Sequence, residues 1–205
     1  MGRSILLVLA TAITTGCAPV FSDLQSARLT GPGRVEVTPS GSQLFFSDDD
    51  GTEHVENHYG VQLAAGVAEV LDLRVRYERA PDVNVIGFGP KFGLLKDKLA
   101  LAVPVGFAFG QDIDSGKTWE AHPTLLATWT PDKRAELTAS AKAIVPLSGE
   151  NRDTLYAVNL GLGLGPDVSR WAFRPEVGFL WNPGESGHYT HLSLGLTFGF
   201  GGKRQ

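Results

Sequence analysis

Two pairs of tryptophans, each separated by ten residues, constrain the fold of this chain most. Trp119 and Trp129 bound one segment in which apolar and polar residues alternate, and Trp171 and Trp181 bound another. Because successive side chains of a β-strand point to opposite faces, an even separation places both rings on the same face. Ten residues of a strand tilted by about 40° rise roughly 25 Å, the height of a bilayer's apolar band. Tryptophan prefers membrane interfaces, so these four residues predict strands that cross a membrane between aromatic girdles.

The N-terminal residues predict export. Arg3 precedes the apolar run Ser4–Ile13, which is too short to cross a bilayer as a helix. The run leads to Thr14-Thr15-Gly16-Cys17, which contains the only cysteine of the chain. This sequence resembles the lipobox of bacterial lipoproteins, which implies that Cys17 is lipidated and begins the mature chain. Cleavage after Val20-Phe21-Ser22 is the alternative, so we assign residues 1–22 to a signal peptide, lipobox and cleavage region.

Composition limits the class of protein. The chain has 205 residues, enough for one domain, and a formal net charge of −4, which argues against a nucleic-acid partner. No segment after the leader is apolar enough for a membrane helix, so any crossing must use strands. Nothing in the sequence indicates a cofactor.

Alternation of apolar and polar residues continues from Val35 almost to the C-terminus. It predicts ten strands, with eight as the alternative: Arg34–Ser47, Tyr59–Val67, Leu71–Tyr77, Val85–Leu94, Leu99–Phe109, Trp119–Trp129, Ala135–Leu147, Leu155–Leu164, Trp171–Trp181 and His188–Phe200. The first is the weakest, because Pro39-Ser40-Gly41 interrupts it. We therefore expect an all-β fold, a closed antiparallel up-and-down transmembrane barrel over residues 34–200. A periplasmic linker at 23–33 and a tail at 201–205 would flank it.

The predicted connections alternate in length. Short turns at 69–70, 96–98, 131–134 and 166–170 are interleaved mostly with longer polar loops at 48–57, 111–118, 148–153 and 182–187. Short periplasmic turns and longer external loops are typical of outer-membrane barrels. Ten strands place both termini on the periplasmic side, within reach of a lipid in the inner leaflet.

The two faces of each strand differ in a way that identifies the inside. Leu192, Leu194 and Leu196 share one face of the last strand, whereas Ser193 and Gly195 lie on the other. Large apolar residues outside and small or charged residues inside are the reverse of a soluble barrel. The inward charges form a predicted lumen network of Asp72, Arg74, Arg76, Glu78, Lys91, Glu136, Lys142, Arg174 and Glu176. We expect ion pairs to plug the lumen, with a charge-selective pore as the alternative.

The C-terminal run LSLGLTFGF resembles the closing strand of small bacterial outer-membrane β-barrel proteins. The resemblance implies a location in the outer membrane of a Gram-negative bacterium. It also implies membrane lipid and the outer-membrane insertion machinery as partners.

His191-Leu192-Ser193 resembles the His-x-Ser motif of outer-membrane lipid A deacylases. The resemblance implies that Ser193 is a nucleophile activated by His191, which an acid orients. No Asp or Glu follows Glu185, so the acid would come from Glu176 or Glu120. A coincidental match is the simpler interpretation, and whether the protein is an enzyme stays open.

All five histidines fall toward the external mouth of the predicted barrel. His58, His122, His188 and His191 are therefore candidates for a Zn²⁺ or Cu²⁺ site or for a rim that changes charge between pH 5 and 8. The simpler interpretation is that polar rim positions accept histidine.

The sequence thus favours an outer-membrane barrel, lipid-anchored, with a plugged or narrow polar lumen and a structural, adhesive or small-solute channel role. Two alternatives come from other classes. One is a deacylase-like enzyme that modifies outer-membrane lipid, and the other is a lipocalin-like lipoprotein that binds an apolar ligand.

Overall fold

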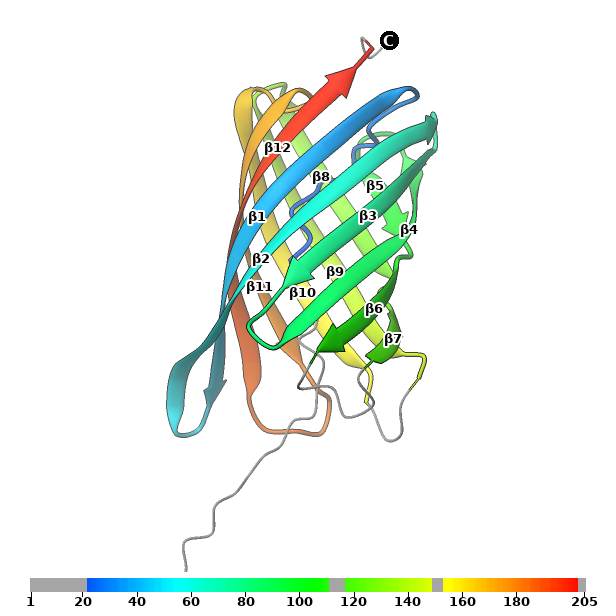
Figure 1. Ribbon diagram of the computed structural model, residues 1–205. Coiled ribbons are helices and arrows are strands. Elements are labelled where there is room, and N and C mark those ends of the chain that lie inside the picture. Colours follow the sequence, from blue (N-terminus) through cyan, green and yellow to red (C-terminus); the bar gives the residue numbers. More distant parts are fainter. Residues whose placement is uncertain (1–21, 111–116, 149–152, 203–205) are drawn as a thin grey trace, which may run out of the picture.

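The chain forms a closed β-barrel, seen from the side in Figure 1. The computed structural model describes residues 22–110, 117–148 and 153–202. Its strands are β1 (Arg34–Asp48), β2 (Gly51–Ala68), β3 (Leu71–Arg79), β4 (Val83–Leu95), β5 (Leu99–Ala102), β6 (Val105–Gly110), β7 (Lys117–Ala121), β8 (Thr124–Asp132), β9 (Ala135–Pro146), β10 (Leu155–Asp167), β11 (Trp171–Trp181) and β12 (His188–Gly201). Neighbours pair antiparallel, and β12 pairs with β1, which closes the sheet. The predicted fold class is confirmed.

The twelve segments form ten barrel strands, because two of the strands are broken at proline. Val103-Pro104 separates β5 from β6, and His122-Pro123 separates β7 from β8. The breaks lie beside each other in the wall, where the His122 nitrogen donates a 2.8 Å hydrogen bond to the Pro104 carbonyl. Proline has no N–H to donate to the neighbouring strand, so the regular hydrogen bonding is interrupted at each proline. The His122–Pro104 hydrogen bond keeps the two strands together at the breaks.

The first hairpin is longer than its sequence pattern predicts. Residues 48–57, expected as an external loop, instead extend β1 and β2 to a tight turn at Asp49-Asp50. Figure 1 shows this hairpin projecting beyond the rest of the barrel. Side chains around the hairpin tip are exposed on both faces, so no apolar alternation marks it as strand. Pro39 does not end β1 either; it only interrupts the pairing with β12 between Val37 and Ser40.

The outer surface of the barrel is apolar. Leucines in three different strands, Leu73, Leu160 and Leu194, are 52%, 51% and 55% exposed, while the alternate positions of the same strands point inward. An apolar exterior around a polar interior is the arrangement of a barrel that crosses an outer membrane. The protein is therefore an outer-membrane-type barrel. Its outer face is apolar, whereas the outer face of a soluble lipocalin-like barrel is polar. No helix in the described part of the chain is long and apolar enough to cross a membrane.

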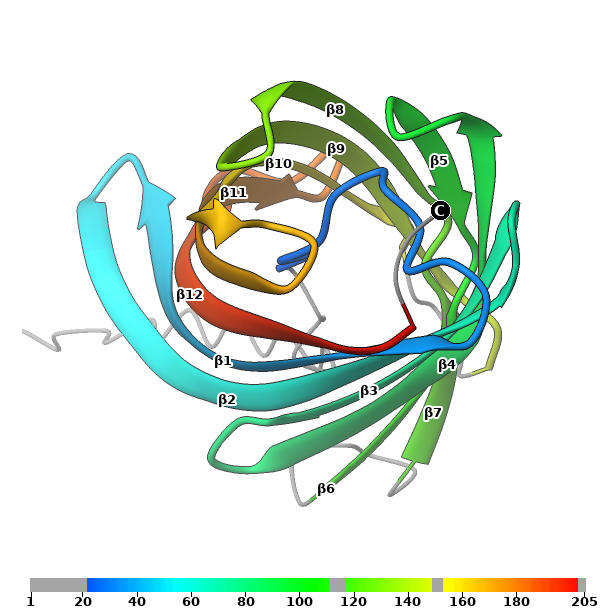
Figure 2. The ribbon, with the colours of Figure 1, turned by 90° about the horizontal axis from the view of Figure 1, so that it is seen from above.

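Residues 22–30 lie inside the barrel, and residues 31–33 lead from the mouth at the end with the short turns to β1. We expected residues 23–33 to form a periplasmic linker, but in the view down the barrel this segment runs within the ring of strands (Figure 2). Ser22, Asp23, Leu24 and Ala27 are each no more than 3% exposed. We call residues 22–33 the lumenal segment. Its polar groups match the inward charges of the wall, which explains why it is not left in water.

Candidate functional site: the occupied lumen

The lumenal segment enters at the end of the barrel that carries the short turns, here the turn side. The Gly33 nitrogen donates to the Gly66 carbonyl at 3.1 Å. Further in, the Thr30 nitrogen donates to Asp72 Oδ2 at 2.9 Å, near the start of β3. The Ala27 nitrogen then reaches Thr128 Oγ1 at 2.7 Å. Contacts therefore follow the segment from the turn side into the lumen.

Asp23 is held by side chains from several strands at once. Lys142 Nζ lies 2.8 Å from its Oδ1, and Asn159 Nδ2 donates to its Oδ2 at 2.6 Å. The Ser140 hydroxyl also donates to this carboxylate. The Gln62 amide donates to the Asp23 carbonyl at 2.8 Å, from the far wall. The carboxylate is thus fully desolvated and fully bonded, as a buried charge requires.

Glu176 fixes the backbone of the same region. Its two carboxylate oxygens accept hydrogen bonds from the nitrogens of Asp23 at 2.6 Å and Leu24 at 2.8 Å. Room for this carboxylate comes from Gly161 on β10, where an added Cβ would lie 3.3 Å from Glu176 Oε2. Gly161 therefore makes space for the Glu176 side chain on the neighbouring strand.

A second charged cluster fills the turn side of the lumen. Arg28 of the lumenal segment pairs with Glu36 at 2.8 Å and with Glu136 at 3.1 Å. Arg174 approaches the other oxygen of Glu136 at 3.5 Å. Lys91, with no exposed surface, donates to the carbonyls of Ser26 and Arg28 at 2.5 and 2.8 Å. The segment is therefore bonded to the wall through both its side chains and its backbone.

The nine predicted lumen charges lie on the inner face of the wall, and six of them form direct pairs with one another. Direct pairs join Asp72 with Arg74 at 3.6 Å, Arg76 with Glu78, and Glu136 with Arg174. Six of the nine also bond the lumenal segment, three of them in addition to their wall partner: Asp72, Arg76, Lys91, Glu136, Lys142 and Glu176. Sequence reasoning missed this segment and the inward Glu36. Residues 23–33 show no alternation of apolar and polar residues, but they contain Asp23 and Arg28. These two charges are the sequence feature that could have indicated binding to the charged lumen wall.

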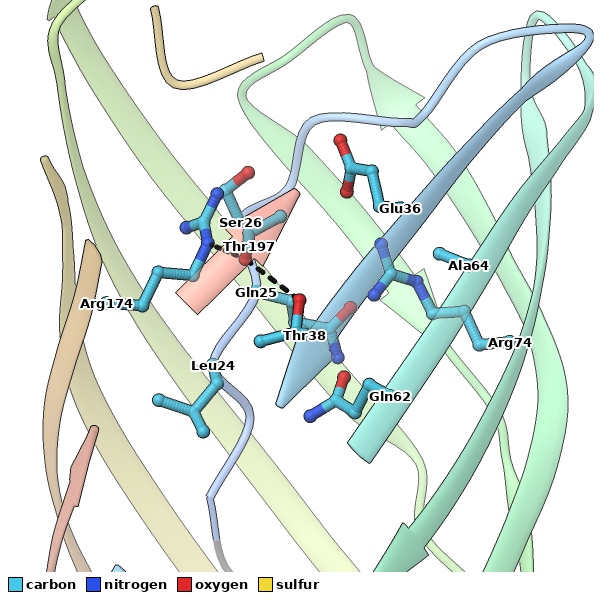
Figure 3. Close-up of a pocket in the computed structure, with 10 residues that line it drawn as sticks. All are labelled: Leu24, Gln25, Ser26, Glu36, Thr38, Gln62, Ala64, Arg74, Arg174 and Thr197. Carbon is cyan, nitrogen blue, oxygen red and sulfur yellow. Dashed lines mark hydrogen bonds between the residues drawn. The ribbon is translucent and has the colours of Figure 1, made fainter. Parts of the chain in front are cut away.

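Little space remains beside the segment. A cavity of about 10 Å³, roughly the size of one water molecule, lies between the segment and the walls of β1, β2, β3, β11 and β12. Figure 3 shows Gln25, Gln62, Arg74 and Arg174 around it. A cavity of this size cannot pass a hydrated ion or a small solute.

His191 and Ser193 are in contact, but they face the lumen. His191 Nδ1 lies 2.7 Å from the Ser193 hydroxyl, which donates to Ser42 Oγ at 2.7 Å. His191 Nε2 lies 3.0 Å from Asn159 Oδ1 and 3.9 Å from Glu176 Oε1. Both residues are at most 2% exposed and lie on the opposite face from the lipid. The His191–Ser193 contact is the one that a hydrolase needs, but an acyl chain in the membrane cannot reach the Ser193 hydroxyl from the lipid-facing side.

The candidate metal-binding histidines each have separate partners. His58 lies 2.8 Å from Glu56 and 3.0 Å from Glu78, whereas His122 lies 3.1 Å from Glu120. His188 is exposed and faces the ring of Phe179. Within the described ranges, no group of three or more His, Cys, Asp or Glu side chains is placed to hold a metal ion. The structure thus does not bring the four histidines together.

The tryptophans lie on the outer surface, two near each end of the barrel. Trp119 lies in β7 near the loop side, and Trp181 ends β11 on the same side. Trp129 in β8 and Trp171 at the start of β11 lie near the turn side. They are between 37% and 66% exposed. Trp119 packs on Phe107, with ring centroids 4.9 Å apart. The proposed lipidation residue, Cys17, lies outside the described residues.

Comparison with known proteins concerns the fold alone. No protein-family model matches the chain, and no curated protein matches it. The translocator domain of the autotransporter NalP from Neisseria meningitidis aligns with a TM-score of 0.49 and 11% identity, over 82% of this chain and 88% of that one. Neisserial surface protein A aligns with a TM-score of 0.44 and 10% identity, over 82% and 99%. The outer membrane protein OprG from Pseudomonas aeruginosa gives 0.33 and 7%, over 83% and 99%.

Proposed function

We propose that this protein is an outer-membrane barrel whose lumen is closed by its own N-terminal segment, with a structural or adhesive role at the cell surface. The observation that carries the proposal is the lumenal segment itself, buried and bonded to most of the predicted lumen charges. Activity at the surface then depends on the loops and the projecting β1–β2 hairpin rather than on passage through the barrel.

The contacts of the segment explain why the closed state persists. Withdrawing it would break the Arg28–Glu136 and Asp23–Lys142 ion pairs and the two backbone hydrogen bonds to Glu176. Hydrogen bonds to charged groups contribute about 1.5–3 kcal/mol each. The loss of several such contacts together makes spontaneous opening rare.

Conductance of the purified barrel in a planar bilayer tests the proposal. The wild-type protein should give no steady unitary current. An Asp23→Ala, Arg28→Ala double variant should flicker open, because it removes both charges that bind the segment to the wall. A steady wild-type current would contradict the closed lumen.

A small-solute channel is the second candidate, favoured by one observation. Every contact described for the segment is non-covalent, and the wall behind it is charged. If the segment is displaced in the cell, a polar passage remains. A double variant that stays silent while folded would remove this candidate.

We also propose that a lipid on Cys17 anchors the chain and that β12 engages the outer-membrane insertion machinery. The lipobox-like sequence and the alternating LSLGLTFGF run support these two points. Incorporation of a palmitate analogue by the wild type, and not by Cys17→Ala, tests the anchor. A lipid-modifying activity gains no support, since Ser193 faces the occupied lumen; unchanged lipid A acylation in a deletion strain would agree.

A further inference from the structure

We propose that the free edge of the projecting β1–β2 hairpin is a docking site, which an extended segment of a partner protein joins as an additional β-strand. The partner segment carries basic and apolar residues in alternation. This inference rests on the adhesive role proposed above, and it names the chemistry of the partner that such a role requires.

Toward the loop side, β2 extends beyond the strand that covers its second edge. The last pair that β2 forms with β3 joins Tyr59 and Arg79. The chain then turns back into β4, where the Ala80 nitrogen donates to the Val83 carbonyl at 2.8 Å. Figure 1 shows the hairpin continuing past this turn. In the described part of the chain, residues 51–57 therefore pair with β1 alone. We call the side of residues 51–57 that faces away from β1 the docking edge.

The docking edge presents backbone groups that can pair with another strand. Its seven residues span about 23 Å at roughly 3.3 Å per residue, which is longer than an ordinary strand of about five or six residues. Apart from Glu56, which is half-buried, every residue of the edge is exposed. An uncovered edge of this kind is a template for a strand from another chain. Such a strand can approach without displacing any element of the barrel.

The charge of the hairpin determines which strand fits. Residues 48–57 include no lysine or arginine but five carboxylates, those of Asp48, Asp49, Asp50, Glu53 and Glu56. Two copies of this edge side by side would place like charges next to each other, which destabilises paired strands. A bulge that leaves Val55 without a partner on β1 adds twist, and bulges and edge charges both prevent self-pairing. The occupant is therefore not a second copy of this chain but a strand with positive side chains.

The two faces of the hairpin differ, which gives the partner its alternation. Glu53 lies opposite Phe46, whose ring centroid is 5.0 Å from that of Tyr189. His54 lies opposite Phe45 on the other face, with ring centroids 5.5 Å apart. A strand added beside β2 places its successive side chains next to Glu53 and His54 in turn. A basic residue suits the first position, and an apolar residue suits the second, beside the two rings.

Peptide binding to the purified full-length barrel in lipid nanodiscs tests the inference. The probe is a fluorescent octapeptide in which lysine and valine alternate, and fluorescence anisotropy gives its affinity. A second peptide has the same side chains but methylated backbone nitrogens, so it cannot donate the hydrogen bonds of a strand. The wild type should bind the first peptide about tenfold or more tightly than the second, because strand addition depends on main-chain hydrogen bonds. A peptide with glutamate in place of lysine should not bind.

A matched pair of variants tests the position of the site. Glu53→Lys reverses a charge on the docking edge, so it should weaken the lysine peptide about tenfold and allow the glutamate peptide to bind. Glu185→Lys makes the same change in the exposed loop between β11 and β12 and should keep the wild-type affinities. Heat-modifiable gel mobility shows that both variants are folded.

Three results would overturn the inference. Equal affinity for the methylated and unmethylated peptides would show attraction by charge without strand addition. Equal losses in Glu53→Lys and Glu185→Lys would move the site away from the docking edge. Absence of binding by any of the peptides would remove the site altogether.

Conductance measured on the same protein separates this inference from the closed barrel. A silent barrel that binds no peptide keeps the closed lumen and loses the docking edge. A conducting barrel that binds the lysine peptide as a strand keeps the docking edge and loses the closed lumen.

Discussion

The outward and inward faces of the same strands obey different rules. Outward, Leu73, Leu160 and Leu194 are half-exposed, and lipid accepts any apolar side chain at such positions. Inward, Glu136 and Lys142 each have a defined partner on the lumenal segment. The outer face therefore specifies where the protein resides, and the inner face specifies what fills it. Substitutions that change the charge, polarity or size of an inward or an outward side chain test this difference between the two faces.

The largest loss is expected for Glu136→Ala. It leaves Arg28 and Arg174 buried without their shared carboxylate, which costs about 3–5 kcal/mol. Urea unfolding in lipid vesicles, followed by tryptophan fluorescence, measures the loss. The matched control, Glu185→Ala in an exposed loop, should change stability very little. Equal effects of the two would show that the inner charges are not individually matched.

Next comes Leu194→Arg on the lipid-facing side. A charged side chain at mid-bilayer costs about 2–4 kcal/mol, so assembly should fall. The fraction of folded barrel, read from heat-modifiable gel mobility, measures it. Leu194→Met, apolar and of similar volume, should behave like the wild type. If arginine were tolerated there, the outward assignment of β12 would be wrong.

A smaller loss is expected for Gly178→Ala. Its Cβ would lie 1.9 Å from Asn159 Oδ1 and 2.2 Å from His191 Nε2, and both side chains are buried. Overpacking of this kind costs about 1–3 kcal/mol. Gly202→Ala, which meets nothing within 4 Å, is the control for the same unfolding measurement. A neutral Gly178→Ala would mean that the His191 region repacks freely.

The smallest effect should come from Gly161→Ala. The new Cβ would lie 3.3 Å from the end of the Glu176 side chain, which can shift by a few tenths of an ångström. We expect a loss below about 1 kcal/mol in the same assay. A loss as large as that of Glu136→Ala would show that the Glu176 carboxylate is more rigidly placed than its contacts indicate.

The sequence predicts the barrel well and its contents poorly, for a physical reason. Alternation identifies the strands because lipid selects every second residue over many positions, as in Leu192, Leu194 and Leu196. The lumenal segment has no such period. Asp23 bonds Ser140 and Asn159, more than a hundred positions away, so no local pattern records the contact. The sequence also failed to predict the tip of the first hairpin as strand. Its side chains are exposed on both faces, so they show no alternation of apolar and polar residues.

The occupied lumen has a consequence for the order of assembly. The lumenal segment precedes β1, and the pairing of β1 with β12 closes the ring. The one segment bonds Asp72 on β3, Lys142 on β9 and Glu176 on β11, strands that lie far apart in the sheet. A segment bound to these strands holds both halves of the sheet around a common centre. We therefore expect it to act as an internal template that favours the meeting of the first and last strands.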